Sequence, residues 1–248
     1  MKAIVLAAGL GTRLRPLTDD RPKALVEVGG QTMLERVLRR LARFGVTQVI
    51  VNVHHHAQLV VDYLATHHNF GLHIEISRED DLLLDTGGGL KQTAEFFLRE
   101  GGNEPFLLHN VDIASTVDLN ALLAAHRASG ALVTLAVKAR ASSRQLLFDA
   151  DGLLCGRRAG QATEWARECS PVEPLAYSCI QAISPRLFPL LKGQGGQSAF
   201  PIFPAYLRMA AEGERIAAFR VDQAYWRDLG KIESIRQAEA DLTTGLWA

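Results

Sequence analysis

The chain has 248 residues, 48% of them hydrophobic, and its 27 basic and 27 acidic side chains give a formal net charge of zero. This length and composition suffice for a large buried core and argue against a disordered chain. The balanced charge also argues against nonspecific nucleic-acid binding, which needs a broad basic surface, so any phosphate site must be local.

The chain has three cysteines, Cys155, Cys169 and Cys179, and no C-x-x-C spacing. This pattern argues against a structural zinc site and a redox pair, and it favours buried or idle thiols. The apolar run after Lys2 breaks at Gly9, too early for a signal peptide, and no stretch reaches transmembrane length. We therefore expect a cytoplasmic protein without a membrane partner, of undetermined oligomeric state.

A glycine-containing stretch follows the first predicted strand, which covers residues 3–6. Gly9 and Gly11 permit a sharp turn that brings backbone N–H groups close to a ligand. The cations around this turn are Arg13, Arg15 and Lys23. Fixed positive charge of this kind suits a polyphosphate leaving group. We interpret the stretch as a triphosphate-binding loop, with an ordinary surface loop as the alternative.

Two other glycine motifs fit the loop poorly. A dinucleotide fingerprint needs a third small residue and a continuing helix, where this chain has Leu14 and Pro16. A P-loop needs Gly-Lys-Ser/Thr, which is absent from the sequence. A dehydrogenase is therefore the weaker alternative.

Strand-like and helical patterns alternate through the first half of the chain. We predict strands at 25–28, 49–53, 72–77, 105–112 and 131–137, with helices after the candidate N-caps Thr32 and Asp118. The alternation predicts an α/β fold, a Rossmann-like three-layer αβα sandwich with a mixed, mostly parallel central sheet.

The second half is less regular. Residues 145–154 contain an Asp-Gly turn and predict a small β-hairpin insertion. The surrounding arginines either reach phosphate or keep the hairpin soluble: Arg140, Arg144, Arg157 and Arg158. Little organisation is predicted between residues 160 and 174. Further elements are expected at 175–180, from 184, and at 205–211, 216–221 and 231–242.

Two other features suggest ligand contacts. The triplet Gly87-Gly88-Gly89 favours a ligand-binding loop over a flexible helix entrance, because unused glycines cost conformational entropy. Asp112 ends a predicted strand and is suited to Mg2+, unless it caps a turn. Consecutive residues His54 to His56 point in different directions and predict a turn rather than a metal site.

The segment L-A-A-G-L-G-T-R-L-R-P-L-T at 6–18, followed by Pro22-Lys23, resembles the signature of the sugar-1-phosphate nucleotidyltransferases. The resemblance implies that Arg13 and Lys23 contact phosphates. It also implies that the loop wraps the nucleotide through Ala7, Ala8, Gly9, Gly11 and Thr12. Thr86, Gly87 and Gly88 match a segment that holds the base.

The resemblance also covers the metal and the sugar. W-R-D-L-G at 226–230 is similar to a family segment whose aspartate, here Asp228, is a second Mg2+ ligand beside Asp112. Asn110 and Ser178 are carried over as further ligand-binding residues. The implied organisation is a single domain, 1–248, with a nucleotide-binding half (1–139) and a sugar-phosphate-binding half (140–248).

The implied reaction is Mg2+-dependent transfer of a nucleotidyl group from an NTP, UTP or GTP, to a sugar 1-phosphate, with release of pyrophosphate. The chain departs from the family pattern where Val111 and Cys179 replace glycines and where a Glu-Lys-Pro element is missing. Lys138 or a nearby arginine is the candidate replacement for that lysine. These departures motivate an alternative, a nucleotide-sugar-binding sensor with weakened turnover.

Overall fold

The computed structural model describes residues 1–191 and 198–247. The chain forms two compact units, each assembled from segments that lie apart in the sequence. The first unit comprises Met1–Leu83, Leu108–Val117 and Ala224–Ala248, and the second comprises Leu84–Leu107 and Asp118–Gln223.

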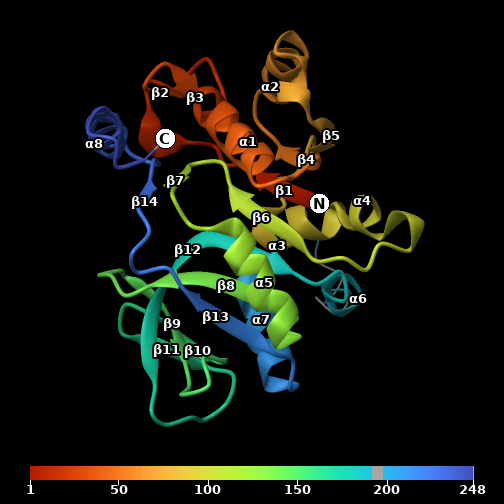
Figure 1. Cartoon of the computed structure of the whole chain (residues 1–248), viewed down its shortest axis with the longest axis vertical. Coiled ribbons are helices and arrows are strands. Elements are labelled where there is room, and N and C mark those ends of the chain that lie inside the picture. Colours follow the sequence, from red (N-terminus) through yellow and green to blue (C-terminus); the bar gives the residue numbers. More distant parts are fainter. Residues whose placement is uncertain (192–197, 248) are drawn as a thin grey trace. The chain divides into compact units, whose positions relative to one another are not determined.

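A parallel sheet organises the first unit. Strand β1 (Lys2–Leu6) pairs with β4 (Gln48–Val53), and β4 pairs with β5 (His73–Arg78), side by side in Figure 1. Strand β6 (Phe106–Asn110) ends in this unit next to β1. Helices α1 (Met33–Arg43) and α2 (Ala57–Thr66) connect successive strands, as the alternating pattern predicts.

Short elements complete the first half of this unit. They are the 3-10 turns η1 (Thr12–Leu14), η2 (Lys23–Leu25) and η3 (His68–Gly71), and the small strands β2 (Glu27–Val28) and β3 (Gln31–Thr32). Helix α1 begins at the predicted N-cap, because the Thr32 hydroxyl accepts a hydrogen bond from the Glu35 N–H at 3.1 Å. The carboxylate of Glu35 does not close a capping box and instead accepts from Tyr63 and Arg39.

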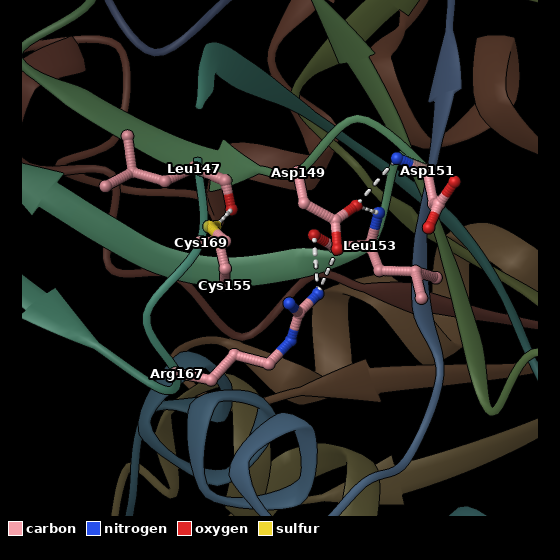
Figure 2. The surroundings of a disulfide bond; sticks show 7 residues. All are labelled: Leu147, Asp149, Asp151, Leu153, Cys155, Arg167 and Cys169. Atoms are coloured by element: carbon pink, nitrogen blue, oxygen red, sulfur yellow. Dashed lines mark hydrogen bonds and ion pairs between the residues drawn. A yellow bond between two sulfur atoms is a disulfide. The ribbon is translucent and has the colours of Figure 1, made fainter. Parts of the chain in front are cut away.

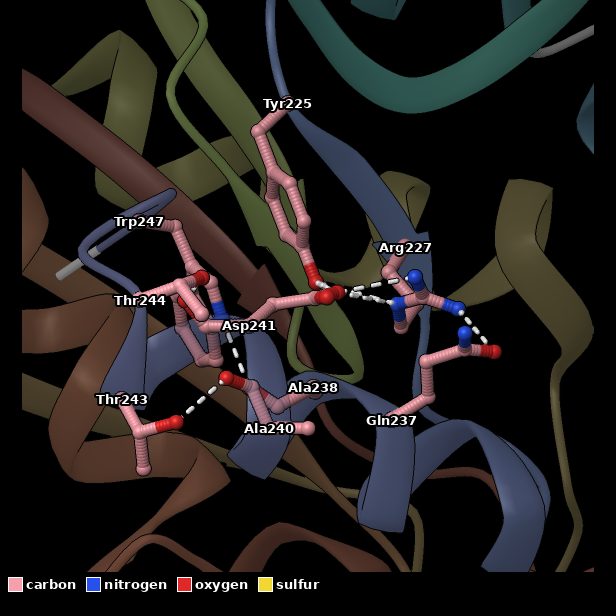
Figure 3. Close-up of polar contacts among 9 residues, drawn as sticks. All are labelled: Tyr225, Arg227, Gln237, Ala238, Ala240, Asp241, Thr243, Thr244 and Trp247. Carbon is pink, nitrogen blue, oxygen red and sulfur yellow. Dashed lines mark hydrogen bonds and ion pairs between the residues drawn. The ribbon is translucent and has the colours of Figure 1, made fainter.

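The C-terminal segment returns to the first unit. Strand β14 (Trp226–Asp228) pairs antiparallel with β7 (Ile113–Ser115), and helix α8 (Ile232–Thr243) contacts β2. Figure 3 shows Tyr225 and Arg227 converging on Asp241, at 2.6 and 2.8 Å. Burial and the neighbouring Asp241 carboxylate raise the pKa of Tyr225 to about 12. These contacts tie β14 to α8.

The second unit is built on a largely antiparallel sheet. Its strands are β8 (Val133–Lys138), β9 (Arg144–Phe148), β10 (Leu154–Ala159), β11 (Ala162–Trp165), β12 (Glu173–Ile183) and β13 (Ile216–Arg220). Only the β13–β8 pair among these is parallel in the described part of the chain. Its helical elements are α3 (Asp85–Gln92), α4 (Ala94–Leu98), η4 (Arg99–Gly101), α5 (Leu119–Ser129), α6 (Leu187–Leu190) and α7 (Ile202–Ala211).

The predicted hairpin insertion is confirmed as β9 and β10, with Gly152 in the left-handed region at φ +71°. Strand β11 extends it within the segment where the sequence predicts little organisation. The fold as a whole confirms the predicted Rossmann-like α/β class, with a mixed, mostly parallel central sheet and helices on both of its sides. No helix in residues 1–191 and 198–247 is long and apolar enough to cross a membrane.

The expectation of idle thiols is wrong for two of the three cysteines. Cys155 of β10 and Cys169 form a disulfide that closes over β11, with a sequence separation of 14 residues (Figure 2). Arg167 pairs with Asp149 beside it. The chain reversal between β10 and β11 brings the two sulfurs together, and C-x-x-C spacing does not describe this long-range proximity.

The glycine triplet lies in a helix rather than a loop. Gly87, Gly88 and Gly89 form part of α3, where glycine is intrinsically unfavourable. A Cβ on Gly87 would lie 2.3 Å from the Phe200 ring, and one on Gly88 would lie 2.2 Å from the Ser198 carbonyl oxygen. The first glycines of the triplet therefore allow a helix to pack directly against the backbone that precedes α7.

Candidate active site

The loop after β1 folds back on itself within the first unit. The Ala7 N–H donates to the Asn52 carbonyl at 2.9 Å, which aligns the loop entrance with the end of β4. Gly11 adopts the left-handed conformation, φ +65°, that its sequence position predicts. Its carbonyl accepts from the Thr18 hydroxyl at 2.9 Å. The loop is thereby held closed, with Arg13 in η1 and Lys23 at the start of η2.

The two loop glycines make room for Lys23. A Cβ on Gly9 would lie 3.2 Å from the Lys23 Nζ, and a Cβ on Gly11 would lie 3.1 Å from the Lys23 Cβ. The lysine therefore runs along the inner side of the loop, against its backbone. The two glycines thus leave space for the Lys23 side chain against the loop, with its ammonium beside Gly9.

Lys23 is paired with the predicted metal ligand Asp112. The Lys23 Nζ lies 2.7 Å from the Asp112 Oδ2, and the two side chains are only 15% and 11% exposed. Asp112 follows β6, whose carboxyl end lies beside the end of β1, since the Val111 N–H donates to the Leu6 carbonyl at 3.0 Å. The parallel order of β6 and β1 therefore joins two sequence-predicted site residues.

The fold also brings Asp228 to this place. Asp228 in β14 stands opposite Ile113 in β7, and the Leu229 N–H donates to the Asp112 carbonyl at 2.8 Å. The Oδ1 of Asp228 accepts from the Gly230 N–H at 2.7 Å, which fixes the carboxylate. Asp228, the last residue of β14, and Asp112, the residue before β7, thus lie at the same end of one small antiparallel ladder.

Arg13 completes the cluster. A Cβ on Gly230 would lie 2.6 Å from the Arg13 Nη2 and 2.7 Å from the Asp228 Oδ1. The guanidinium and the carboxylate therefore both contact the surface of one glycine. Arg13, Lys23, Asp112 and Asp228, the four predicted catalytic residues, all lie in the first unit and are brought together there.

The two aspartates fit a magnesium ion that shares its ligands with a substrate. Mg2+ keeps several waters and is usually held by one or two carboxylates together with substrate phosphates. No group of three His, Cys, Asp or Glu side chains in the described residues is placed to hold a metal ion. Such a three-residue cage is not needed for Mg2+, and the metal role of Asp112 and Asp228 stays a prediction.

Sequence reasoning missed a buried polar pair at the ends of β4 and β5. The Asn52 Nδ2 donates to the Glu79 Oε1 at 2.9 Å, and both side chains are buried beside the entrance of the loop. The signal was an asparagine within an otherwise apolar strand, since buried polar groups need partners. This pair supports the backbone that presents Ala7.

Another polar residue that sequence reasoning missed precedes Asn110. His109 is fully buried in β6, and its Nδ1 lies 2.8 Å from the Asn110 carbonyl oxygen. Burial and the charge of Arg40 lower the pKa of His109 to about 4, so the imidazole is neutral at pH 7. The predicted ligand role of Asn110, at the half-buried end of β6, stays a prediction.

The residues predicted to contact the base and the sugar, Thr86, Gly87, Gly88 and Ser178, belong to the second unit, whereas Ala8 and Thr12 of the loop belong to the first. The Thr86 hydroxyl accepts from the Ile202 N–H at 3.1 Å, and the Gly87 N–H donates to the Phe200 carbonyl at 2.9 Å. Ser178 is buried in β12, next to Cys179, which has a φ of +58° at a break in the strand register. This conformation favours glycine, which explains why the family pattern has glycine there.

Comparison with known proteins identifies the relatives of this chain. The family model described as "Nucleotidyl transferase" matches residues 2–146, which include the loop, Lys23 and Asp112. An N-acetylmuramate alpha-1-phosphate uridylyltransferase from Caulobacter vibrioides is 32% identical over 97% of this chain and 96% of its own length.

Further relatives also belong to the sugar-1-phosphate nucleotidyltransferases by their names. A mannose-1-phosphate guanylyltransferase from Mycobacterium tuberculosis is 30% identical over 98% of this chain and 65% of its own length. The crystal structure of a putative glucose-1-phosphate thymidylyltransferase from Bacillus anthracis superposes with a TM-score of 0.78 at 18% identity, over 97% of this chain and 94% of that one. The structural likeness supports the fold.

Proposed function

The chain belongs to the nucleotidyl transferase family, and we propose that it transfers a nucleotidyl group from an NTP to a sugar 1-phosphate in a Mg2+-dependent reaction. The products are an NDP-sugar and pyrophosphate. The observation that carries the proposal is the cluster of Arg13, Lys23, Asp112 and Asp228 in the first unit. Two cations and two carboxylates around a glycine loop match the needs of a polyphosphate with a divalent cation.

In this mechanism the loop binds the triphosphate. Backbone N–H groups of the loop, the Arg13 guanidinium and the Lys23 ammonium hold the β- and γ-phosphates and stabilise the charge that develops on pyrophosphate as it leaves. Asp112 and Asp228 would hold Mg2+, which offsets the repulsion between the two phosphates that react. The protein acts by positioning and electrostatics.

The attacking group needs no protein base. An oxygen of the sugar phosphate attacks the α-phosphorus in line, and the bond to the bridging oxygen of pyrophosphate breaks. A phosphate monoester is largely ionised at pH 7, because its second pKa is about 6. Consequently no general base or protein nucleophile is assigned, and buried His109 is a structural group.

The relative from Caulobacter vibrioides, which matches over nearly its whole length, suggests the substrates. We propose UTP and N-acetylmuramate 1-phosphate as the leading pair, and GTP with mannose 1-phosphate as the second. Thr86, Gly87, Gly88 and Ser178 are the residues proposed to contact the base and the sugar. The lysine of the missing Glu-Lys-Pro element would be replaced by Lys138 or a nearby arginine.

A substrate panel tests the proposal. Purified protein is mixed with each NTP and each sugar 1-phosphate in the presence of Mg2+, and pyrophosphate release and NDP-sugar formation are measured. We expect turnover with at least one pair and its loss in Asp112→Asn. Asp62→Asn is the matched control, since Asp62 lies in α2, where its carboxylate accepts a hydrogen bond from Gln58 and its carbonyl accepts one from Thr66.

The same panel distinguishes the alternative of a nucleotide-sugar sensor. A sensor would bind the nucleotide or the NDP-sugar in calorimetry without releasing pyrophosphate from any pair. Activity of Asp112→Asn equal to that of the wild type would refute the metal role of Asp112.

A further inference from the structure

The Lys23–Asp112 pair presents a conflict of roles. An ammonium 2.7 Å from the Asp112 Oδ2 occupies the place of a cation that this oxygen would bind. Under the proposed function, Lys23 holds phosphate and Asp112 holds a metal ion. While Lys23 and Asp112 are bonded to each other in the unliganded protein, Lys23 does not bind phosphate and Asp112 does not bind a metal ion through this oxygen.

The position of the lysine suggests how the conflict is resolved. Its Nζ lies 3.2 Å from the place of a Cβ on Gly9, so the ammonium already rests against the phosphate-binding loop. A lysine stem is flexible, and a change of rotamer is the movement that would carry its charge from the carboxylate toward the loop. Arg13 and Asp228 both lie close to the place of a Cβ on Gly230, so a second cation and a second carboxylate are near this pair.

We propose that Lys23 is an exchangeable counter-ion, which occupies Asp112 in the unliganded protein and is transferred to the triphosphate when the nucleotide binds. Asp112 then becomes available to the divalent cation. This inference rests on the proposed function, since it uses the metal role assigned to Asp112. It adds an order of binding. The protein without nucleotide binds the metal ion weakly, and nucleotide binding frees Asp112 to bind it.

Electrostatics predicts how Lys23 changes the affinity of Asp112 for a metal ion. A positive charge within a few ångströms of a metal ligand opposes a divalent cation, and the opposition is strong because both side chains are largely buried. Removing the ammonium should therefore tighten metal binding to the bare protein by about tenfold or more. By linkage, the nucleotide and the metal favour each other's binding by equal factors.

Mn2+ is the probe, followed by the paramagnetic resonance signal of the unbound ion, in the absence of nucleotide. We expect weak binding to the wild type and binding about tenfold tighter or more to Lys23→Met. Lys2→Met is the matched control, because it removes the same charge at the other end of β1 from the loop. Thermal unfolding confirms that each variant is folded, and Lys23→Gln replaces Lys23→Met if that variant is not.

Each outcome is informative. Equal Mn2+ affinity of the wild type and Lys23→Met, or the same gain in Lys2→Met, would overturn the exchange. A gain that disappears in the double variant Lys23→Met/Asp112→Asn supports it, whereas a gain that persists there shows that the ion binds elsewhere and overturns it. The readout needs no turnover, so a failure of the substrate panel and a failure of the exchange are distinguishable.

Discussion

Gly230 has no side chain and so leaves space for the Arg13 guanidinium, and Gly230→Ala tests whether this space is needed. The added Cβ would lie 2.6 Å from the Arg13 Nη2 and 2.7 Å from the Asp228 Oδ1. Both distances are too short for a real Cβ contact, so the Arg13 guanidinium and the Asp228 carboxylate must both shift. An ordinary contact needs about 3.5 Å, which requires a shift of about 1 Å, and such a misplacement at a reacting centre costs about 100-fold in rate.

The assay is kcat/KM for NDP-sugar formation together with the free energy of unfolding in urea. We expect a loss of about 100-fold in kcat/KM and a change in stability below about 1 kcal/mol, because the displaced groups are the ends of two side chains and not backbone. Gly30→Ala is the control for a glycine substitution that affects stability and not the site. Gly30 has a φ of +75° and open space around it, so its substitution should cost about 1 kcal/mol of stability and leave activity intact.

A double-mutant cycle isolates the cause. In an Arg13→Ala background, Gly230→Ala should cost less, since one of the two displaced side chains is gone. An undiminished penalty in that background, or wild-type activity in Gly230→Ala, would refute the reasoning.

Three further predictions concern stability. Cys179→Gly should raise the free energy of unfolding by about 1 kcal/mol, because a φ of +58° is strained for cysteine; an unfolding curve no more stable than wild type would contradict this. Gly87→Ala should lower it by about 1–3 kcal/mol, since its Cβ would meet the Phe200 ring at 2.3 Å, and the same urea titration measures the loss. Burial lowers the pKa values of His109 and His126 to about 4, whereas the unfolded chain binds these protons near pH 6.5. The free energy of unfolding should therefore be highest above about pH 6.5 and fall toward pH 4, by up to about 3 kcal/mol for each histidine. A flat profile of this free energy between pH 7 and 5 would count against the prediction.

The regular elements could be predicted from the sequence because their signals are local. Thr32 and Asp118 cap helices α1 and α5 as expected, and the Asp151-Gly152 turn closes the hairpin. A cap or a turn depends on backbone groups within a few residues, which the sequence displays directly. The β11 segment was missed, since a short exposed strand has little apolar pattern to reveal it.

Glycine and cysteine were harder to interpret, because each has roles that depend on distant neighbours. The triplet at residues 87–89 suggested a loop because unused glycines cost conformational entropy. The segment that leaves no space for a Cβ there contains Phe200, which is far away in the sequence. Cys155 and Cys169 meet only through the reversal between β10 and β11. No spacing rule contains this information.

For the candidate site, the sequence by itself determined which groups are candidates: a glycine loop, its cations, Asp112 at the end of a predicted strand, and Asp228 through the resemblance to one family. Only the tertiary structure decided which of these groups meet. Asp112 and Asp228 become neighbours through the pairing of β7 with β14, and Lys23 reaches Asp112 because β6 ends beside β1. The physical reason is that residue types and local spacing are properties of the chain, whereas proximity between distant segments arises from strand pairing and burial.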